Sequence, residues 1–210
     1  MTPLANVIYS NQSVSAQANI YGAGMASPPA PGGGGAGVLP TGYALPTNAV
    51  SVTFSNVTGS IVVDLYSGDD TNDPDGVGAA VGSSSNTGFS PISGIKAPNA
   101  GYIVGVFIGG PIPTNAPPSL NFTYGAGNNP GTTAFTSLSP LLYQTFFIGD
   151  GLTGDGTGAT QIFNVPAGAT SLYLGISDAN GYNGSPGAYG DNTGNFTIGS
   201  ITVTLAVPPP

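Results

Sequence analysis

Short apolar runs alternate with polar positions along most of the chain. The stretches 50–54 and 119–123 alternate strictly, with the two-residue period of a half-buried strand. Residues 102–108 are almost continuously apolar, as in a strand that is buried on both faces. The pattern predicts about ten strands. They cover residues 6–10, 14–21, 50–54, 60–65, 102–108, 119–123, 143–148, 160–165, 171–176 and 195–204.

Glycine and proline separate these apolar runs from one another. No window has the 3.6-residue apolar period of a helix. Residues 56–59 have turn chemistry, which predicts a hairpin between 50–54 and 60–65. We expect one all-β domain over 1–210, an antiparallel β-sandwich of jelly-roll or galactose-binding-like type, with long Gly/Asp-rich loops. The Pro/Gly-rich stretch 28–37 predicts an irregular loop, and 207–210 a Pro-rich tail.

The charged residues exclude several functional classes. Lys96 is the only basic residue, all nine acidic residues are Asp, and the formal net charge is −8, with neither His nor Cys. Binding to nucleic acid or to an anionic membrane requires cationic side chains. A Ser–His–Asp triad and a zinc site are excluded too. We expect no enzyme; the alternative is a two-Asp glycosidase at Asp150 with Asp155 or Asp178 with Asp191.

Two Asp-rich segments contain candidate ligands for a hard cation such as Ca²⁺, which binds six to eight oxygen atoms. The first spans Asp69 to Asp75, where Asp70 and Asp73 are the candidates. It lacks the terminal Glu and the flanking helices of an EF-hand. A solvated acidic loop is the alternative.

The second segment lies between two predicted strands. Asp178 ends the incoming strand, and Asp191 with Asn192 begins the outgoing one. Adjacent strand ends would bring these oxygen atoms together, while Gly187 and Gly190 let the backbone turn its carbonyls inward. The alternative is a turn-rich loop with incidental Asp and Asn.

The run from Asp178 through Pro186-Gly187-Ala188-Tyr189-Gly190-Asp191-Asn192 to Phe196 resembles the calcium and sugar loop of the PA-IL-type galactophilic bacterial lectins. The resemblance implies that Asp178, Asp191, Asn192 and the Ala188 carbonyl bind Ca²⁺, which in turn takes two sugar hydroxyls. It also implies a backbone ligand from an early loop, for which 69–75 is the closest analogue. The present loop is six residues longer, Asp191 replaces an amide, Ala188 replaces Thr, and the family's sugar-contacting His is absent.

Most of the chain, including 14–24, 137–140 and 146–154, also resembles extracellular bacterial proteins of the PEP-CTERM class. That resemblance implies export and residence at the cell surface or in a matrix. The class ends in a Val-Pro-Glu-Pro signal, a membrane span and a basic tail, whereas this chain stops at 206–210. We expect the anchor to be absent or to lie beyond this sequence.

The leading hypothesis is a secreted, calcium-dependent, lectin-like protein whose partner is a carbohydrate or exopolysaccharide. The expected sugar-binding residues are Asp178, Tyr182, Tyr189, Asp191 and Asn192, the tyrosines by stacking on sugar faces. For any one of the ten tyrosines, however, a place in the hydrophobic core is the better interpretation. The alternative function is a structural subunit of an extracellular filament, sheath or biofilm matrix, assembled as a homo-oligomer or filament. Uncharged strands that can pair at their edges favour it.

Overall fold

The computed structural model describes residues 6–63, 71–77, 83–125 and 127–207. These residues form an all-β fold with two short 3₁₀ turns, η1 (Ile20–Gly22) and η2 (Asn180–Tyr182). Across the described ranges there is no α-helix, and no helix is long and apolar enough to cross a membrane. The prediction of an all-β fold built from antiparallel sheets is confirmed.

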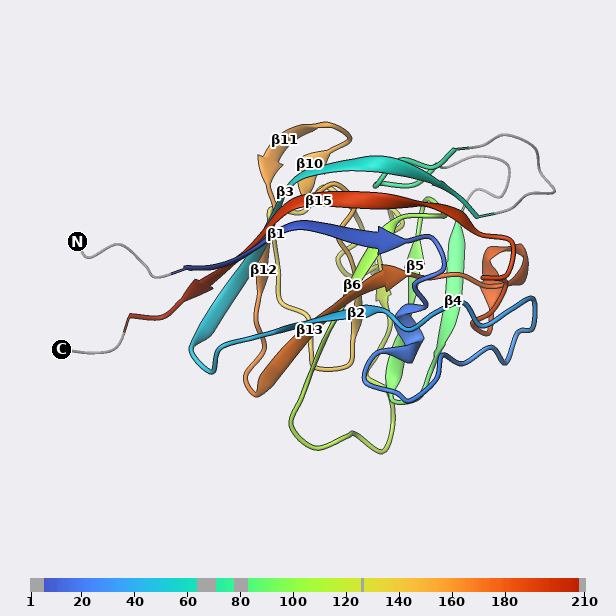
Figure 1. Ribbon diagram of the computed structural model, residues 1–210, viewed down its shortest axis with the longest axis horizontal. Coiled ribbons are helices and arrows are strands. Elements are labelled where there is room, and N and C mark those ends of the chain that lie inside the picture. The colour runs from blue at the N-terminus through green and yellow to red at the C-terminus, as the bar shows by residue number, and fades with distance from the viewer. Residues whose placement is uncertain (1–5, 64–70, 78–82, 126, 208–210) are drawn as a thin grey trace.

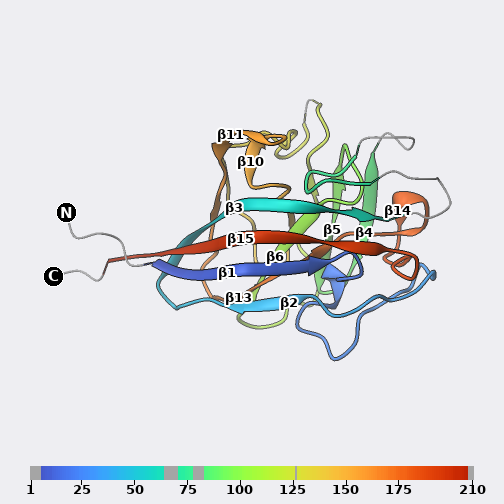
Figure 2. The ribbon, with the colours of Figure 1, turned by 45° about the horizontal axis from the view of Figure 1, so that its top comes forward.

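The first sheet contains the three longest strands, which run side by side along the long axis of the molecule (Figures 1 and 2). Its order is β1 (Asn6–Ser15), β15 (Thr193–Leu205), β3 (Ala49–Val62), β12 (Ile162–Asn164) and β8 (Ser137–Leu138). All neighbours are antiparallel except β12 and β8. Pairing of β1 with β15 places Asn6 opposite Thr204, so the first and last strands lie together.

The second sheet faces the first and is antiparallel throughout. Its order is β2 (Thr41–Ala44), β13 (Ala169–Ile176), β6 (Ile103–Gly109) and β9 (Thr145–Phe147). β6 and β13 are its central strands, and β6 is buried along almost its whole length. The continuous apolar run at 102–108 therefore forms the doubly buried strand that its pattern predicts.

A third sheet crosses the long strands steeply (Figures 1 and 2). Its order is β14 (Asn183–Gly184), β4 (Ser84–Phe89), β5 (Ile92–Ala97) and β7 (Leu120–Asn121). A separate hairpin pairs β10 (Leu152–Gly154) with β11 (Thr157–Thr160). β14 matters most for the site, because it is part of the loop that contains the predicted ligands.

Phenylalanine rings join the two main sheets across the core. Phe54 and Phe163 of the first sheet meet with ring centroids 5.4 Å apart. Phe163 in turn lies 5.3 Å from Phe146 of β9, which stacks on Phe107 of β6 at 5.1 Å. All four side chains are buried. Aromatic contacts of this kind add about 0.5–1.5 kcal/mol each beyond the burial of apolar area.

The predicted hairpin at 50–65 is wrong, because β3 continues through the expected turn. Asn56 (φ +53°) and Gly59 (φ +101°) adopt left-handed backbone conformations that kink the strand without reversing it. Asn11 of β1, also at φ +53°, lies at the same level of the sheet, and both asparagines flank Gly199 of β15. Left-handed residues therefore occur at the same level in the two strands that flank β15.

Candidate functional site

The predicted ligands lie on the connection between β13 and β15. β13 belongs to the second sheet and β15 to the first, so residues 177–192 cross from one sheet to the other. The crossing takes place at the end of the molecule opposite the start of β1 and the end of β15 (Figure 1). We call residues 177–192 the crossover loop; η2 and β14 are part of it.

Asp178 is held rigidly at the start of the crossover loop and is only 2% exposed. Its Oδ1 accepts a hydrogen bond from the Ala179 amide (2.8 Å) and its Oδ2 from Asn192 Nδ2 (2.9 Å). Its own amide donates to the Tyr189 hydroxyl (3.0 Å), which donates to the Ile176 carbonyl (2.9 Å). The two ends of the crossover loop therefore bring together a buried carboxylate and a buried amide.

Asn192 contributes an oxygen atom that lacks a partner. The residue is 1% exposed, and its Nδ2 also donates to the Ala16 carbonyl (3.0 Å). Its Oδ1 is buried and accepts no hydrogen bond. A buried acceptor without a donor costs about 1–3 kcal/mol, and a bound ion or water is a common explanation.

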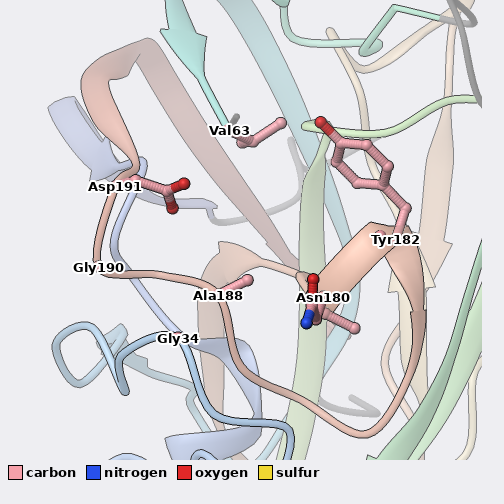
Figure 3. A pocket seen from close by; sticks show the side chains of 9 residues that line it. Gly34, Val63, Asn180, Tyr182, Ala188, Gly190 and Asp191 are labelled. Carbon is pink, nitrogen blue, oxygen red and sulfur yellow. The ribbon is translucent and has the colours of Figure 1, made fainter. Parts of the chain in front are cut away.

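A pocket of about 570 Å³ opens at the crossover loop and is lined by Ala179 and Asp191, the chain neighbours of this pair. Its lining residues are Gly34, Val63, Ala179, Asn180, Gly181, Tyr182, Ala188, Gly190 and Asp191. Asp191, half-buried, and Tyr182 lie on different sides of the pocket (Figure 3). Tyr182 (φ +60°) and Ala188 (φ +65°) both adopt left-handed backbone conformations. Such residues cost about 1–3 kcal/mol each and concentrate at functional sites.

The Pro/Gly-rich loop at 28–37 is irregular, as predicted, but it also forms one wall of the site. Four backbone hydrogen bonds join it to the crossover loop: Gly32 N to Pro186 O (2.8 Å), Ala188 N to Gly33 O (2.7 Å), Tyr189 N to Gly35 O (3.3 Å) and Gly190 N to Gly34 O (2.9 Å). A Cβ on Gly35 would lie 2.7 Å from the Gly190 backbone. Only glycine fits at so close an approach. This role of 32–35 is not predicted from the sequence, where the glycines of both segments are the available signal.

A buried polar cluster supports Asp178 from the core side. Tyr21 Oη and Ser177 Oγ are hydrogen-bonded at 2.6 Å, and Asn86 Nδ2 donates to the same Ser177 oxygen. Burial raises the pKa of the Tyr21 hydroxyl, and the charge of Asp178 raises it further. Asn86 Oδ1 is a second buried acceptor without a partner. None of these residues stands out in the sequence, because a buried Tyr, Ser or Asn has no distinctive pattern.

The structure corrects the assignment of Tyr189 as a sugar-stacking residue. Its ring is fully buried, and burial raises the pKa of its hydroxyl well above the ordinary value. Its role is to fix Asp178 and Ile176 through hydrogen bonds. Tyr182 is half-buried and lines the pocket, so its ring stays accessible.

Asp73 lies in a different acidic cluster, and Asp70 falls outside the described residues. Asp73 Oδ1 accepts from the Asp75 amide (3.0 Å), and its pKa is raised by burial and by the charge of Asp155. Asp75 Oδ1 accepts from the Asp150 amide (3.3 Å). Among the described residues, the early segment 32–35 hydrogen-bonds to the crossover loop, and so do Ala16 and Gln17 through Asn192. Part of the predicted analogue, 69–75, lies outside the described residues.

The crossover loop thus gathers Asp178, Asn192, Ala188 and Asp191 around or next to one pocket. In the described part of the chain no three carboxylates lie close enough together to hold a metal on their own. Amide and carbonyl oxygens would have to complete any cation site. Comparison with protein-family models, curated proteins and solved structures finds no match to this chain.

Proposed function

We propose that this chain binds carbohydrate through a Ca²⁺ ion held at the crossover loop. The observation that carries the proposal is the unpartnered Oδ1 of Asn192, buried next to the buried carboxylate of Asp178. Asp191 and the carbonyl of Ala188 are the further ligands. We also propose that the protein acts outside the cell. Calcium sites of extracellular modules have Kd values of about 10⁻⁴–10⁻³ M.

The available donors fit Ca²⁺ and not a softer metal. Every candidate ligand is an oxygen atom, and the chain has no His or Cys. Two carboxylates would balance the charge of a divalent ion, while amide and backbone oxygens suit the variable geometry of Ca²⁺. Asn192 Oδ1 would gain the partner that it lacks.

The pocket supports a sugar as the ligand. Its volume of about 570 Å³ falls within the range of about 300–1,000 Å³ that is usual for small-molecule sites. A bound ion would supply positive charge to vicinal sugar hydroxyls. The Tyr182 ring offers an apolar wall and Asp191 a hydrogen-bond acceptor (Figure 3). Asp178 and Asn192 are too deeply buried for a sugar, so their contribution would pass through the ion.

Removal of calcium should lower the melting temperature and abolish glycan binding together. An ion that binds only the folded state stabilises it by about 2.7 kcal/mol at a hundredfold excess over Kd. For a chain of this length, each kcal/mol corresponds to about 2–4 °C. Thermal melts in chelator and in millimolar calcium, with glycan-array binding under both conditions, measure the two effects.

Three variants distinguish loss of calcium binding from general loss of stability. Asp191→Asn should weaken calcium binding with little change in the chelated melting temperature, because Asp191 makes no hydrogen bond to another described residue. Asp178→Asn should weaken calcium binding too, but also reduce stability. Asp155→Asn is the matched control, since Asp155 is exposed on the β10–β11 hairpin. Identical melts in chelator and calcium would rule out the ion and, with it, this account of sugar binding.

The edge of the first sheet favours a second candidate, a structural subunit. In the described strand order β1 is an edge strand, its ten residues carry no charge, and Ile8 is 58% exposed. A long uncharged edge is a template for pairing with another copy. Light scattering over a dilution series tests this role: concentration-dependent oligomers that Ile8→Lys abolishes would support it, and a monomer at every concentration would refute it.

A further inference from the structure

The chain contains two Asn-Gly dipeptides, and both lie in the crossover loop, at Asn180-Gly181 and Asn183-Gly184. Both asparagines are exposed. Asn180 lines the pocket, whereas Asn183 begins β14. The dipeptide is the one most prone to loss of its side-chain amide, because a residue without a Cβ leaves its backbone nitrogen open to attack by the preceding side chain.

The reaction needs only water. The backbone nitrogen of the glycine attacks Cγ of the asparagine, a new C–N bond forms, and the Cγ–Nδ2 bond breaks. The amide nitrogen leaves as ammonia and takes the proton of the glycine nitrogen. One water molecule then opens the five-membered imide at either carbonyl, which yields Asp or isoAsp. No oxidant, cofactor or enzyme takes part.

The surroundings of Asn180 leave this attack unobstructed. Neither the Asn180 side chain nor the Gly181 amide hydrogen-bonds to another described residue. A Cβ at Gly181 would meet open space, as it would at Gly184, so the glycine nitrogen is sterically open in both dipeptides. Asn180 is one of the residues that line the pocket (Figure 3).

Asn183 has the same sequence context but is held by its neighbours. It pairs with Ser85 across the β14–β4 ladder, and Gly184 pairs with Asn86. The Gly184 carbonyl accepts a hydrogen bond from Thr87 Oγ1 (3.1 Å). Closure of the imide ring requires rotation of the backbone between Asn and Gly, which this pairing resists.

We propose that Asn180 is a self-modification site, at which spontaneous deamidation places a new carboxylate in the pocket wall. Asn180 converts faster than Asn183, because strand pairing holds only the second, whereas the turn at the first is closed by the hydrogen bond from Tyr182 N to the Ala179 carbonyl (2.8 Å). The product adds one negative charge to a pocket that already contains Asp191. The effect on calcium affinity rests on the proposed function, whereas the modification itself does not.

The experiment follows both sites in one sample of the full chain. Purified protein is aged at mildly alkaline pH, and chymotryptic peptides are then analysed by mass spectrometry, with isoaspartyl methyltransferase labelling to identify isoAsp. The expected result is conversion at Asn180 well ahead of Asn183. Asn180→Gln should remove the modified species at 180, and Asn183→Gln should leave the rate at 180 unchanged.

Denaturant provides the decisive control. In the unfolded chain both dipeptides should react at similar rates, so that the difference between them disappears. Equal rates in the native protein, or faster conversion at Asn183, would overturn the inference. Calcium titration of Asn180→Asp measures the consequence separately: if this variant and the wild type both fail to bind calcium, the proposed function fails while the modification site stands.

Discussion

Asp75 carries a buried carboxylate oxygen, Oδ2, that has no hydrogen-bond partner. Burial raises the pKa of this group to about 7, with the nearby charge of Asp150 as the next cause. An ordinary Asp titrates at about 4. The fold therefore favours protonated Asp75. Its contribution to stability is fully present below about pH 4 and is lost as the pH rises through about 7.

We therefore expect the melting temperature in chelator to fall between pH 4 and pH 8. Asp75→Asn should flatten this profile and raise the melting temperature at pH 8, since a neutral amide keeps the acceptor for Asp150 N–H. Circular-dichroism melts across the pH range test whether the melting temperature falls or rises with pH. Asp191→Asn removes one charge from a different region and serves as control. A wild-type profile that rises towards pH 8 would contradict the assignment.

Single residues also show how much of the candidate site can be predicted from the sequence. It predicts the meeting of Asp178 and Asn192, because each lies next to an apolar strand and strand ends converge. It does not separate Tyr189 from Tyr182, which share the same loop, because depth of burial depends on packing against other segments. Asn86 and Ser177 have no sequence signal, since the fold alone brings them beside Asp178.

At the scale of elements, β3 shows how a turn signal can mislead. Asn56 and Gly59 are typical turn residues, and both have positive φ. The same conformations within a long strand produce a kink, after which buried positions change from Val52 and Phe54 to Ile61 and Val63. Pairing with β15 on both sides of the kink decides between the two outcomes, and that pairing is not local information.

Asn56 offers a direct test of the kink. Asn56→Gly should be close to neutral, because glycine adopts positive φ freely. Asn56→Val should reduce the free energy of unfolding by about 1–3 kcal/mol, since a β-branched side chain is strained there. Urea denaturation measures both. Because Asn56 is exposed, loss of core packing does not complicate the comparison, and equal stability of the two variants would show that the kink is not strained.

The contact between loops 32–35 and 186–190 gives a second element-scale prediction. Gly33 (φ +77°) and Gly35 (φ +98°) both have positive φ, but a Cβ meets open space at Gly33 and the Gly190 backbone at Gly35. Gly33→Ala therefore carries backbone strain alone, about 1–3 kcal/mol. Gly35→Ala adds a steric overlap, so it should destabilise the fold more and weaken calcium binding further. Thermal melts and calcium titration of the pair isolate the effect of the close approach.

In the whole molecule, the candidate site lies far from the start of β1 and the end of β15. β15 spans this distance from the crossover loop (Figure 1). Alternation along the sequence predicts the all-β class, but not which strand links the two ends of the molecule. Strand order depends on contacts between segments that are distant in sequence, such as β1 with β15 and β3 with β15.

This position of β15 has a mechanical consequence. A ligand pulled away from the pocket while the C-terminal end is held would load β15 along its length. Its hydrogen bonds to β1 and β3 lie across the strand direction and would resist together, in shear. Force applied between the two chain ends would instead separate β1 from β15 one pair at a time, starting where Asn6 lies opposite Thr204. The same fold should therefore yield at low force between the start of β1 and the end of β15, and at much higher force between the pocket and the end of β15.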